Sequence, residues 1–380
     1  LSTASYDNIS FSVDTQDSFN QGLTFSADGT KLYVVGDASD AIFQYSSGVP
    51  TSSPVTVRGL TNGTSYTFNV WAINPLGWSS PSDASGGVSP AAPIGLFAGG
   101  NSGAASNVID FFVFSSAGNA TDFGDLTVAR LEVAQGQVGS NTRGLFYGGE
   151  NSGGSKVNTI DFVTFASAGN ATDFGNMTSV ANQSGTCSNA VRGLRAAGNT
   201  SAVQNIIDFV TIASAGNATD FGDTTQAGAG TSGCASPTRG IFASLADGNS
   251  NVINFVTIDT AGNATDFGDL TNSTNRRASG GSGTRGVFAG GGNTNVIQYI
   301  TIASAGNAAD FGDLTIGAEH CSGTSGGGLM LIALGSDGSS LLNTVDQITI
   351  ATTGNASDFG DLTVARSGSN GASNAHGGLS

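Results

Sequence analysis

The eight residues Gly-Asn-Ala-Thr-Asp-Phe-Gly-Asp at positions 118–125 recur along most of this chain. Five further copies, with at most one substitution each, follow at spacings of 44 to 51 residues. Repeats of this length are typical of proteins in which each copy forms one supersecondary unit that stacks on its neighbours. The motif therefore predicts a repeat architecture over residues 94–380. The six copies begin at Gly118, Gly169, Gly216, Gly262, Gly306 and Gly354.

Each repeat has the pattern of four short strands. The first is apolar and ends in small residues, as in Gly-Leu-Phe-Ala-Gly-Gly at 95–100, and the second begins at Asn. An Ala-Gly-Asn turn then leads into the third, Asp-Phe-Gly-Asp-Leu-Thr, and the fourth is rich in Gly, Ser, Cys and Ala, as at Ser184–Ala190 or Ser232–Ser236. The Asn-led strand is apolar on both faces apart from one Asp or Asn, so we expect neighbouring repeats to cover both faces of each sheet. The predicted Asn-led strands are Asn107–Phe114, Asn158–Phe165, Asn205–Ile212, Asn251–Ile258, Asn295–Ile302 and Asn343–Ile350.

The composition favours an all-β fold. The 380 residues include 58 glycines, and the acidic residues are almost all Asp, which prefers turns to helices. Val, Ile, Phe and Thr occur in short runs, and no stretch has a sustained helical period. The length leaves room for two or three domains with a large buried core.

The charge and the apolar runs exclude several functional classes. A formal net charge of −16 argues against binding DNA or RNA through phosphates, and its even spread over the repeats favours a role in solubility. The longest useful apolar run, Leu329–Leu334, is far shorter than a membrane helix, so membrane insertion is not expected. No signal peptide is visible, and the start at Leu1 suggests a processed or excised product. Three cysteines do not make a disulfide framework.

Residues 1–93 do not follow the repeat. At 22–36 two alternating strands flank an Asp-Gly turn, which predicts a β-hairpin, and a third strand is expected at Ala41–Tyr45. The stretch 57–77 resembles the second half of a fibronectin type III domain, with Tyr66 as the corner tyrosine. The resulting expectation is a hairpin or single propeller-like blade at 1–46, a fibronectin-like segment and linker at 47–93, and the repeat domain at 94–380.

The strand order within the repeats resembles the kelch repeat of β-propellers. The resemblance implies a six-bladed propeller at 94–380, with seven blades as the alternative if the hairpin within 1–46 joins the ring. Residues Ala365–Asn374 match the small-residue strand that the first blade lacks, so the C-terminal segment is expected to close the ring, and His376–Leu379 aligns with the start of a following apolar strand. The tryptophan of kelch repeats is replaced by Phe123, Phe174, Phe221, Phe267, Phe311 and Phe359.

The acidic residues of the motif raise two chemical hypotheses. Asp-Phe-Gly is the metal-binding triplet of protein kinases, but six copies without a glycine-rich loop or catalytic loop exclude that interpretation. The paired acids could ligate calcium, although hydrogen bonding at turns and strand ends is the favoured explanation. These pairs are Asp122/Asp125, Asp220/Asp223, Asp266/Asp269, Asp310/Asp313 and Asp358/Asp361, with Asp173/Asn176 in the second repeat.

Other reactive or charged side chains also recur with the repeat. Cys187, Cys234 and Cys321 fall in the small-residue segments, where buried packing near the axis is expected rather than metal binding or a disulfide. His320 and His376 lie in the same segment and could be metal ligands. The Asn-Ala-Thr sequons would be glycosylated only in a eukaryotic secretory setting. Four arginines are expected to bind an Asp of an adjacent blade or to line one mouth of the channel: Arg143, Arg192, Arg239 and Arg285.

The functional expectation is a non-enzymatic structural or adhesion protein. The repeats resemble those of structural and tail-fibre proteins of marine phages, especially cyanophages, which implies a location in a virion or outside the cell. Expected partners are other virion or self subunits and a host-surface glycan or protein, and no catalytic residue, metal site or cofactor is assigned. The alternatives are a propeller-fold glycan-active enzyme and a bacterial secreted or surface adhesin. The candidate binding loops are Leu131–Asn141, Glu150–Val157, Leu245–Asn251 and Leu334–Leu342.

Overall fold

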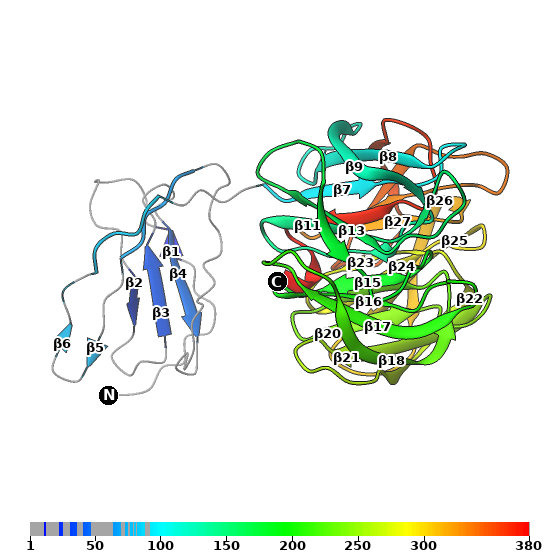
Figure 1. The fold of residues 1–380 in the computed structure, drawn as a ribbon. Helices are drawn as coiled ribbons and strands as arrows, with labels where there is room; N and C mark the ends of the chain where they lie inside the picture. Colours follow the sequence, from blue (N-terminus) through cyan, green and yellow to red (C-terminus); the bar gives the residue numbers. More distant parts are fainter. Residues whose placement is uncertain are drawn as a thin grey trace. The chain divides into compact units, whose positions relative to one another are not determined.

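The computed structural model describes residues 92–379 in full, with 64–69, 80 and 82–87, and the backbone of six short strands between residues 11 and 78. The chain divides into two compact units, Leu1–Ala92 and Pro93–Ser380 (Figure 1). The described residues form β-strands and one short 3-10 helix, and they contain no α-helix. The predicted all-β fold is confirmed.

The first unit contains a small antiparallel sheet. Its order is β1 (Phe11–Ser12), β4 (Ala41–Ser46), β3 (Lys31–Val35) and β2 (Leu23–Phe25), and a separate hairpin joins β5 (Ile73–Asn74) to β6 (Gly77–Trp78). The pairing of β2 with β3 confirms the predicted hairpin, and β4 confirms the third strand. Tyr66 is buried, as a corner tyrosine would be, but most of the fibronectin-like stretch lies outside the described residues, so that resemblance stays a prediction.

In the second unit a pattern of antiparallel strand pairing recurs along the chain, and we number its six copies repeats 1 to 6. In repeat 3, β15 (Gly185–Ser188), β16 (Arg192–Ala196), β17 (Gln204–Thr211) and β18 (Thr219–Gly228) pair in chain order. We call these the inner, second, third and outer strands. The other repeats are, in the same strand order, repeat 1 with β31 (Asn370–Ser373), β7 (Ile94–Ala98), β8 (Ser106–Val113) and β9 (Thr121–Leu131); repeat 2 with β10 (Gln135–Gly136), β11 (Arg143–Tyr147), β13 (Thr159–Thr164) and β14 (Thr172–Asn176); repeat 4 with β19 (Ser232–Ala235), β20 (Arg239–Ala243), β21 (Ser250–Thr257) and β22 (Thr265–Thr274); repeat 5 with β23 (Ala278–Gly281), β24 (Arg285–Ala289), β25 (Thr294–Thr301) and β26 (Ala309–Ala318); and repeat 6 with β27 (Ser322–Gly326), β28 (Leu329–Ala333), β29 (Thr344–Thr349) and β30 (Ser357–Asp361). In repeat 2 the inner strand forms no ladder with the second strand, and an antiparallel bridge between Gly139 and Gly144 joins the two segments instead.

The strand boundaries match the sequence expectation closely. Each third strand begins and ends within one residue of its predicted Asn-led strand. The outer strands of repeats 1, 3, 4 and 5 are longer than the predicted six residues, because after a bulge the chain rejoins the ladder, as in the pairing of Ser250 with Thr274. The short β12 (Glu150–Asn151) pairs with β9 of the preceding repeat.

The first repeat is completed by the C-terminal segment. β31 pairs antiparallel with β7, with Asn370 opposite Ala98, as predicted from the missing strand (Figure 1). The expectation that His376–Leu379 aligns with the start of a further strand is wrong. Because β7 already occupies the place beside β31, Gly377–Leu379 forms the 3-10 helix η1.

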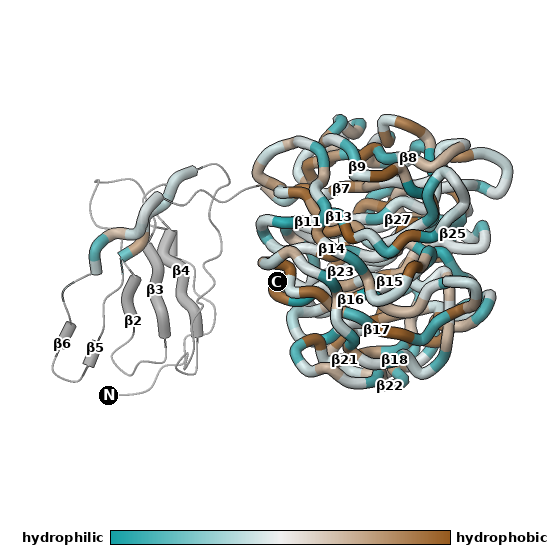
Figure 2. The backbone as a smooth tube through the Cα atoms, in the orientation of Figure 1, coloured by the Kyte–Doolittle hydropathy of each residue, from teal (hydrophilic) through white to brown (hydrophobic). Residues whose placement is uncertain are grey.

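Apolar side chains fill the spaces between adjacent repeats. Among the described residues there are six buried clusters, and each combines side chains of two neighbouring repeats. One of them packs Phe97 and Phe112 of repeat 1 against Leu331 and Phe359 of repeat 6. Each sheet is therefore covered on both faces, as expected, and apolar stretches alternate with polar turns along the tube in Figure 2.

The polar residue within each third strand joins it to the preceding repeat. Asp161 is fully buried and accepts hydrogen bonds from Thr127, at 2.6 Å from Oγ1 and 3.2 Å from the backbone nitrogen. Asp110 makes the same contacts with Thr363, which links repeat 6 to repeat 1. The equivalent acceptors in the other repeats are Asp208, Asn254, Gln298 and Asp346.

The repeated motif is itself a contact between neighbouring repeats. The Gly169 nitrogen donates to the Phe123 carbonyl at 2.7 Å, and Asn170 Oδ1 accepts from the Asp125 nitrogen at 3.1 Å. A Cβ on Gly124 would overlap the Gly169 carbonyl, so this position requires glycine. Equivalent bonds to the following Asn occur in all six repeats, including that from Asp361 to Asn119.

The inner strands meet at the centre. β10 pairs in parallel with both β15 and β19, and the Gln137 side chain bonds Ser325 of repeat 6 at 2.8 and 2.9 Å. A Cβ on Gly136 would overlap the carbonyl of Thr186. The small residues of the inner strands are therefore a requirement of close approach.

Candidate functional site

The strand order separates the loops of the second unit into two sets. The paired inner strands run parallel, so the inner-to-second and third-to-outer turns lie at one end, and the second-to-third and outer-to-inner loops lie at the other. We call the first the repeated end and the second the variable end. Three predicted binding loops, Glu150–Val157, Leu245–Asn251 and Leu334–Leu342, are second-to-third connections at the variable end, and Leu131–Asn141 begins there.

The repeated end carries the same contacts in most repeats. Ser140 Oγ accepts from the backbone nitrogens of Thr142 and Arg143, and Asn189, Ser236 and Ser282 do the same in the next three repeats. Arg143 Nη1 donates to the carbonyl of Ile212 in the adjacent repeat, and its guanidinium lies over the Phe162 ring. The predicted Arg–Asp contact is therefore wrong for these arginines. Their partners are backbone carbonyls of the adjacent repeat, reached also by Arg192, Arg239 and Arg285.

At the variable end six residues with left-handed backbone encircle the start of the inner strands. One comes from each repeat, and we call them the axial ring. Backbone hydrogen bonds of 2.9 to 3.2 Å join them in a cycle, with the Arg276 carbonyl accepting from Cys321 and the Gly368 carbonyl from Val133. The members and their φ angles are Glu132 (52°), Gln183 (57°), Gly230 (71°), Arg276 (57°), His320 (53°) and Gly368 (63°).

The left-handed conformation makes the identity of these residues informative. For a residue with a Cβ it costs roughly 1–2 kcal/mol, and glycine avoids that cost. Repeats 3 and 6 use glycine in the ring, whereas four repeats carry polar side chains there. By contrast, Ala197 has a φ of 60° at the turn where repeats 1, 2 and 5 have glycine, so its conformation follows from the turn alone. Strained positions are concentrated at functional sites, so the four side chains mark a candidate site.

Three of these side chains gather around Glu132. The Glu132 carboxylate lies 2.9 Å from His320 Nδ1 and 4.0 Å from Arg276 Nε. Burial raises the pKa of Glu132, but His320, Arg276 and a hydrogen bond from Gln183 outweigh it, so the net pKa is lowered. The side chains of Glu132 and His320 are 17% and 16% exposed, and that of Arg276 is 31% exposed, so the cluster is accessible to solvent. A partly exposed carboxylate, guanidinium, amide and imidazole can exchange hydrogen bonds with a ligand.

The two histidines lie at opposite ends of the inner strands. His376 is buried at the repeated end, with Nε2 at 3.2 Å from Ser188 Oγ and 3.1 Å from the Gly139 carbonyl. Burial lowers the pKa of His376 to about 4. The hypothesis of a shared metal site is wrong because His320 is at the variable end. The described residues contain no group of three or more His, Cys, Asp or Glu side chains able to hold a metal.

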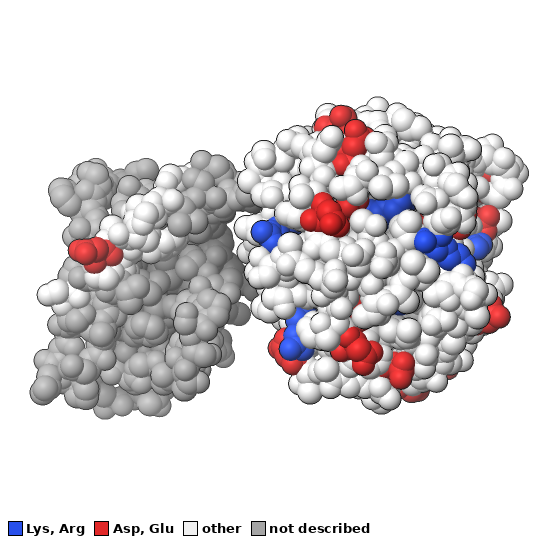
Figure 3. Space-filling model, in the orientation of Figure 1, with Lys and Arg blue, Asp and Glu red and all other residues white. Residues whose placement is uncertain are grey.

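The remaining sequence candidates belong to the scaffold. The three cysteines are buried and free, and burial raises the pKa of Cys234 and Cys321 to about 12. In each acidic pair the first Asp is exposed and the backbone nitrogen of the second position bonds the next repeat. On the face shown in Figure 3, charged side chains of the second unit form small groups within a largely uncharged surface.

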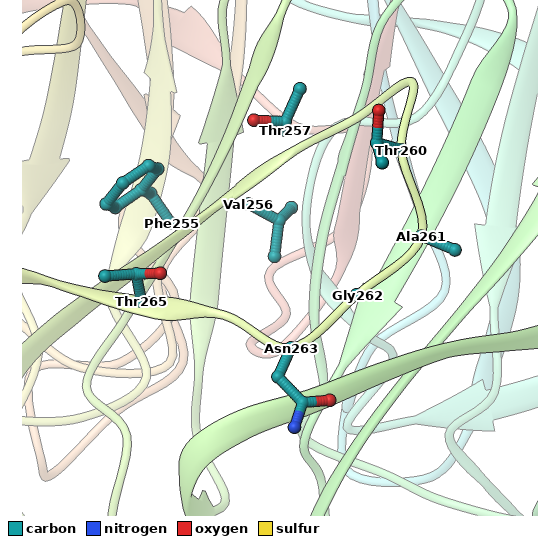
Figure 4. Close-up of a pocket in the computed structure, with 8 residues that line it drawn as sticks. All are labelled: Phe255, Val256, Thr257, Thr260, Ala261, Gly262, Asn263 and Thr265. Carbon is teal, nitrogen blue, oxygen red and sulfur yellow. The ribbon is translucent and has the colours of Figure 1, made fainter.

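A pocket lies within the hairpin of β21 and β22, and its lining residues are shown in Figure 4. They include Phe255, Asn263 and Thr265, which occupy positions of the recurring sequence pattern, with Tyr299 and Gln347 at the Phe255 position in repeats 5 and 6. Asn263 Oδ1 already accepts from the Asp223 nitrogen at 3.0 Å. We therefore assign this pocket to the repeated scaffold.

Sequence comparison leaves the family open. No helix among the described residues is long and apolar enough to cross a membrane. No protein-family model matches the chain, and no curated protein matches it in sequence.

Proposed function

We propose that Pro93–Ser380 is a six-bladed, kelch-like β-propeller that serves as a non-enzymatic structural or adhesion module. Each repeat would be one blade. The support is the cyclic arrangement of contacts, in which repeat 6 bonds repeat 1 as every other repeat bonds the next. The closing pair β31–β7 joins the first and last parts of the array by the backbone hydrogen bonds of an antiparallel ladder. Closure pairs the free edge of β7, and radial repetition leaves only short sheet edges, which suits a durable extracellular scaffold.

The observation that carries the functional proposal is the contrast between the two ends. At the repeated end, a Ser or Asn makes the same contacts in four successive repeats. At the variable end, the axial ring and the second-to-third loops differ from repeat to repeat. A rigid scaffold that presents chemically distinct loops on one face is an arrangement suited to recognition.

The biological setting we propose is a phage tail fibre or virion appendage. It rests on the resemblance of the repeats to those of marine phage structural proteins. In that setting the module is located in the virion or outside the cell, and it contacts other virion or self subunits and a host-surface glycan or protein. Mass spectrometry of purified virions tests the setting, and absence of the chain from them would contradict it. A bacterial secreted or surface adhesin would use the same fold and face.

A glycan-active enzyme is the second candidate, favoured by the contact between Glu132 and His320. An imidazole 2.9 Å from a carboxylate is a pair able to act as a general base. Incubation of host capsular polysaccharide with the full chain distinguishes the two proposals. An adhesion protein leaves the chain length of the polysaccharide unchanged while binding it. A fall in chain length that Glu132→Gln abolishes would refute the non-enzymatic proposal.

A further inference from the structure

The axial ring has one backbone conformation at its six positions but five different residue types. The backbone bonds that join its members need no side chain, because Gly230 and Gly368 make them as Gln183 does. The side chains at the other four positions are therefore not required to build the ring. They are retained in a conformation that glycine would adopt more easily.

Gly368 lies beside Glu132 and His320 in the ring. A Cβ on Gly368 would lie 3.6 Å from the backbone of Glu132 and 3.8 Å from His320 Nδ1, which are ordinary van der Waals distances. The left-handed backbone at Gly368, rather than lack of space, is therefore what favours glycine at this position.

The ring contains both donors and acceptors, and their charges balance. Glu132 is kept ionised by its neighbours and only accepts hydrogen bonds, whereas the Arg276 guanidinium only donates them. Gln183 can do both, and Gly230 and Gly368 add no charge. The Glu132 carboxylate and the net charge of −16 would repel a strongly anionic ligand. A hydroxyl group both donates and accepts without charge, so adjacent hydroxyls match this set best.

We propose that the axial ring is a binding site for a neutral saccharide. Glu132 accepts a hydrogen bond from one hydroxyl, Arg276 and Gln183 donate to neighbouring oxygens, and His320 orients the Glu132 carboxylate. This inference rests on the proposed adhesion function and names the class of ligand that this part of the variable end would recognise.

Binding of monosaccharides to the full chain tests the proposal. The probes are the methyl glycosides of glucose, galactose and mannose, with methyl glucuronide as the anionic comparison and glucosamine as the cationic one. Saturation-transfer NMR detects contact, and calorimetry gives the affinity. At least one neutral glycoside should bind with a dissociation constant on the order of 1 mM, more tightly than either charged sugar.

Glycine substitutions separate a binding site from a structural brace. Arg276→Gly and Gln183→Gly keep the left-handed backbone while removing the side chains, and Ala197→Gly is the matched control outside the ring. The proposal expects roughly tenfold weaker saccharide binding for both ring variants and unchanged binding for the control, with a cooperative melting transition showing that each variant is folded.

Three results would overturn the inference. They are failure of every neutral glycoside to bind the wild type, equal binding by the ring variants, and preference for a charged sugar. Adhesion of the full chain to host cells is measured in parallel. Adhesion that persists in Arg276→Gly would refute the saccharide site and leave the adhesion proposal standing, whereas no adhesion and no presence in virions would refute the adhesion proposal itself.

Discussion

The buried pair Arg130–Asp161 should be a sensitive contact between repeats 1 and 2, and Arg366–Asp110 is its equivalent between repeats 6 and 1. Arg130 Nη2 lies 2.6 Å from Asp161 Oδ2, both side chains are fully buried, and Nη1 donates to the carbonyls of Gly148 and Thr159. Burial lowers the pKa of Arg130, and Asp161 opposes that shift. Asp161→Asn leaves a buried cation without its counter-ion, which typically costs about 3–5 kcal/mol of unfolding free energy.

Asp346→Asn is the matched control. Asp346 is also fully buried and accepts from Thr315, but it takes part in none of the ion pairs with arginine among the described residues. Burial raises the pKa of Asp346, so its ionised form destabilises the fold at neutral pH, and this penalty disappears as the pH falls through that raised pKa. Loss of one hydrogen bond costs about 1 kcal/mol, and removing the penalty offsets it. At pH 7 the control should therefore change stability by less than about 1 kcal/mol.

A double variant tests whether the unpaired cation is the cause. Arg130→Thr with Asp161→Gln copies the residues that repeats 4 and 5 have at these positions, Thr274 and Gln298. It should recover much of the loss, because a buried ion pair replaced as a whole costs little.

The tryptophans give this experiment an internal reference. Both Trp71 and Trp78 belong to Leu1–Ala92, so their fluorescence follows the first unit while far-UV circular dichroism also follows the repeats. Urea unfolding of the full chain should show a shifted repeat transition and an unshifted fluorescence transition. Equal losses for Asp161→Asn and Asp346→Asn would refute the argument.

Four further outcomes are expected. Glu132→Gln should lower stability at neutral pH, and the difference from the wild type should vanish as the pH falls through the lowered pKa of Glu132, measured by melting at several pH values. The three cysteines should not react with Ellman's reagent at pH 8 until the chain is unfolded in urea, since burial raises their pKa. Gly124→Ala should destabilise by about 1–3 kcal/mol in urea, whereas Gly169→Ala, with open space around it, should not. Deleting residues 370–380 should increase protease susceptibility, because it removes β31, and an unchanged digestion pattern would contradict the closing role of that strand.

Much of the fold was predictable because the same order of strands and turns recurs in six copies of the repeat. The third strands were located within one residue, since their apolar residues lie between an Asn and a Gly-Asn turn. The small-residue segments and the closing role of Ala365–Asn374 followed from the order of the strands, which the pairing of β31 with β7 confirms. The polar residue in the third strand was noticed, but its partner Thr was not, because that threonine belongs to a different repeat.

The candidate site was largely missed. Sequence reasoning named His320 but grouped it with His376. The structure places His320 at the variable end of the inner strands and His376 at the repeated end. The signal that could have found the ring was the single position before each small-residue segment, where the copies read Glu, Gln, Gly, Arg, His and Gly. Its importance depends on φ angles and on contacts between repeats, which no single copy of the repeat reveals.

The pairing of β31 with β7 has a consequence for synthesis and folding. The partner of Ala98 is Asn370, so repeat 1 is synthesised first but cannot pair its inner strand until repeats 2 to 6 have been synthesised. Until then β7 presents an unpaired edge, and at high protein concentration the β31 segment of another copy could occupy it instead of its own. Closure over such a sequence separation is slow, which favours folding at low protein concentration. Concentrated refolding should therefore yield strand-exchanged dimers and longer chains of molecules.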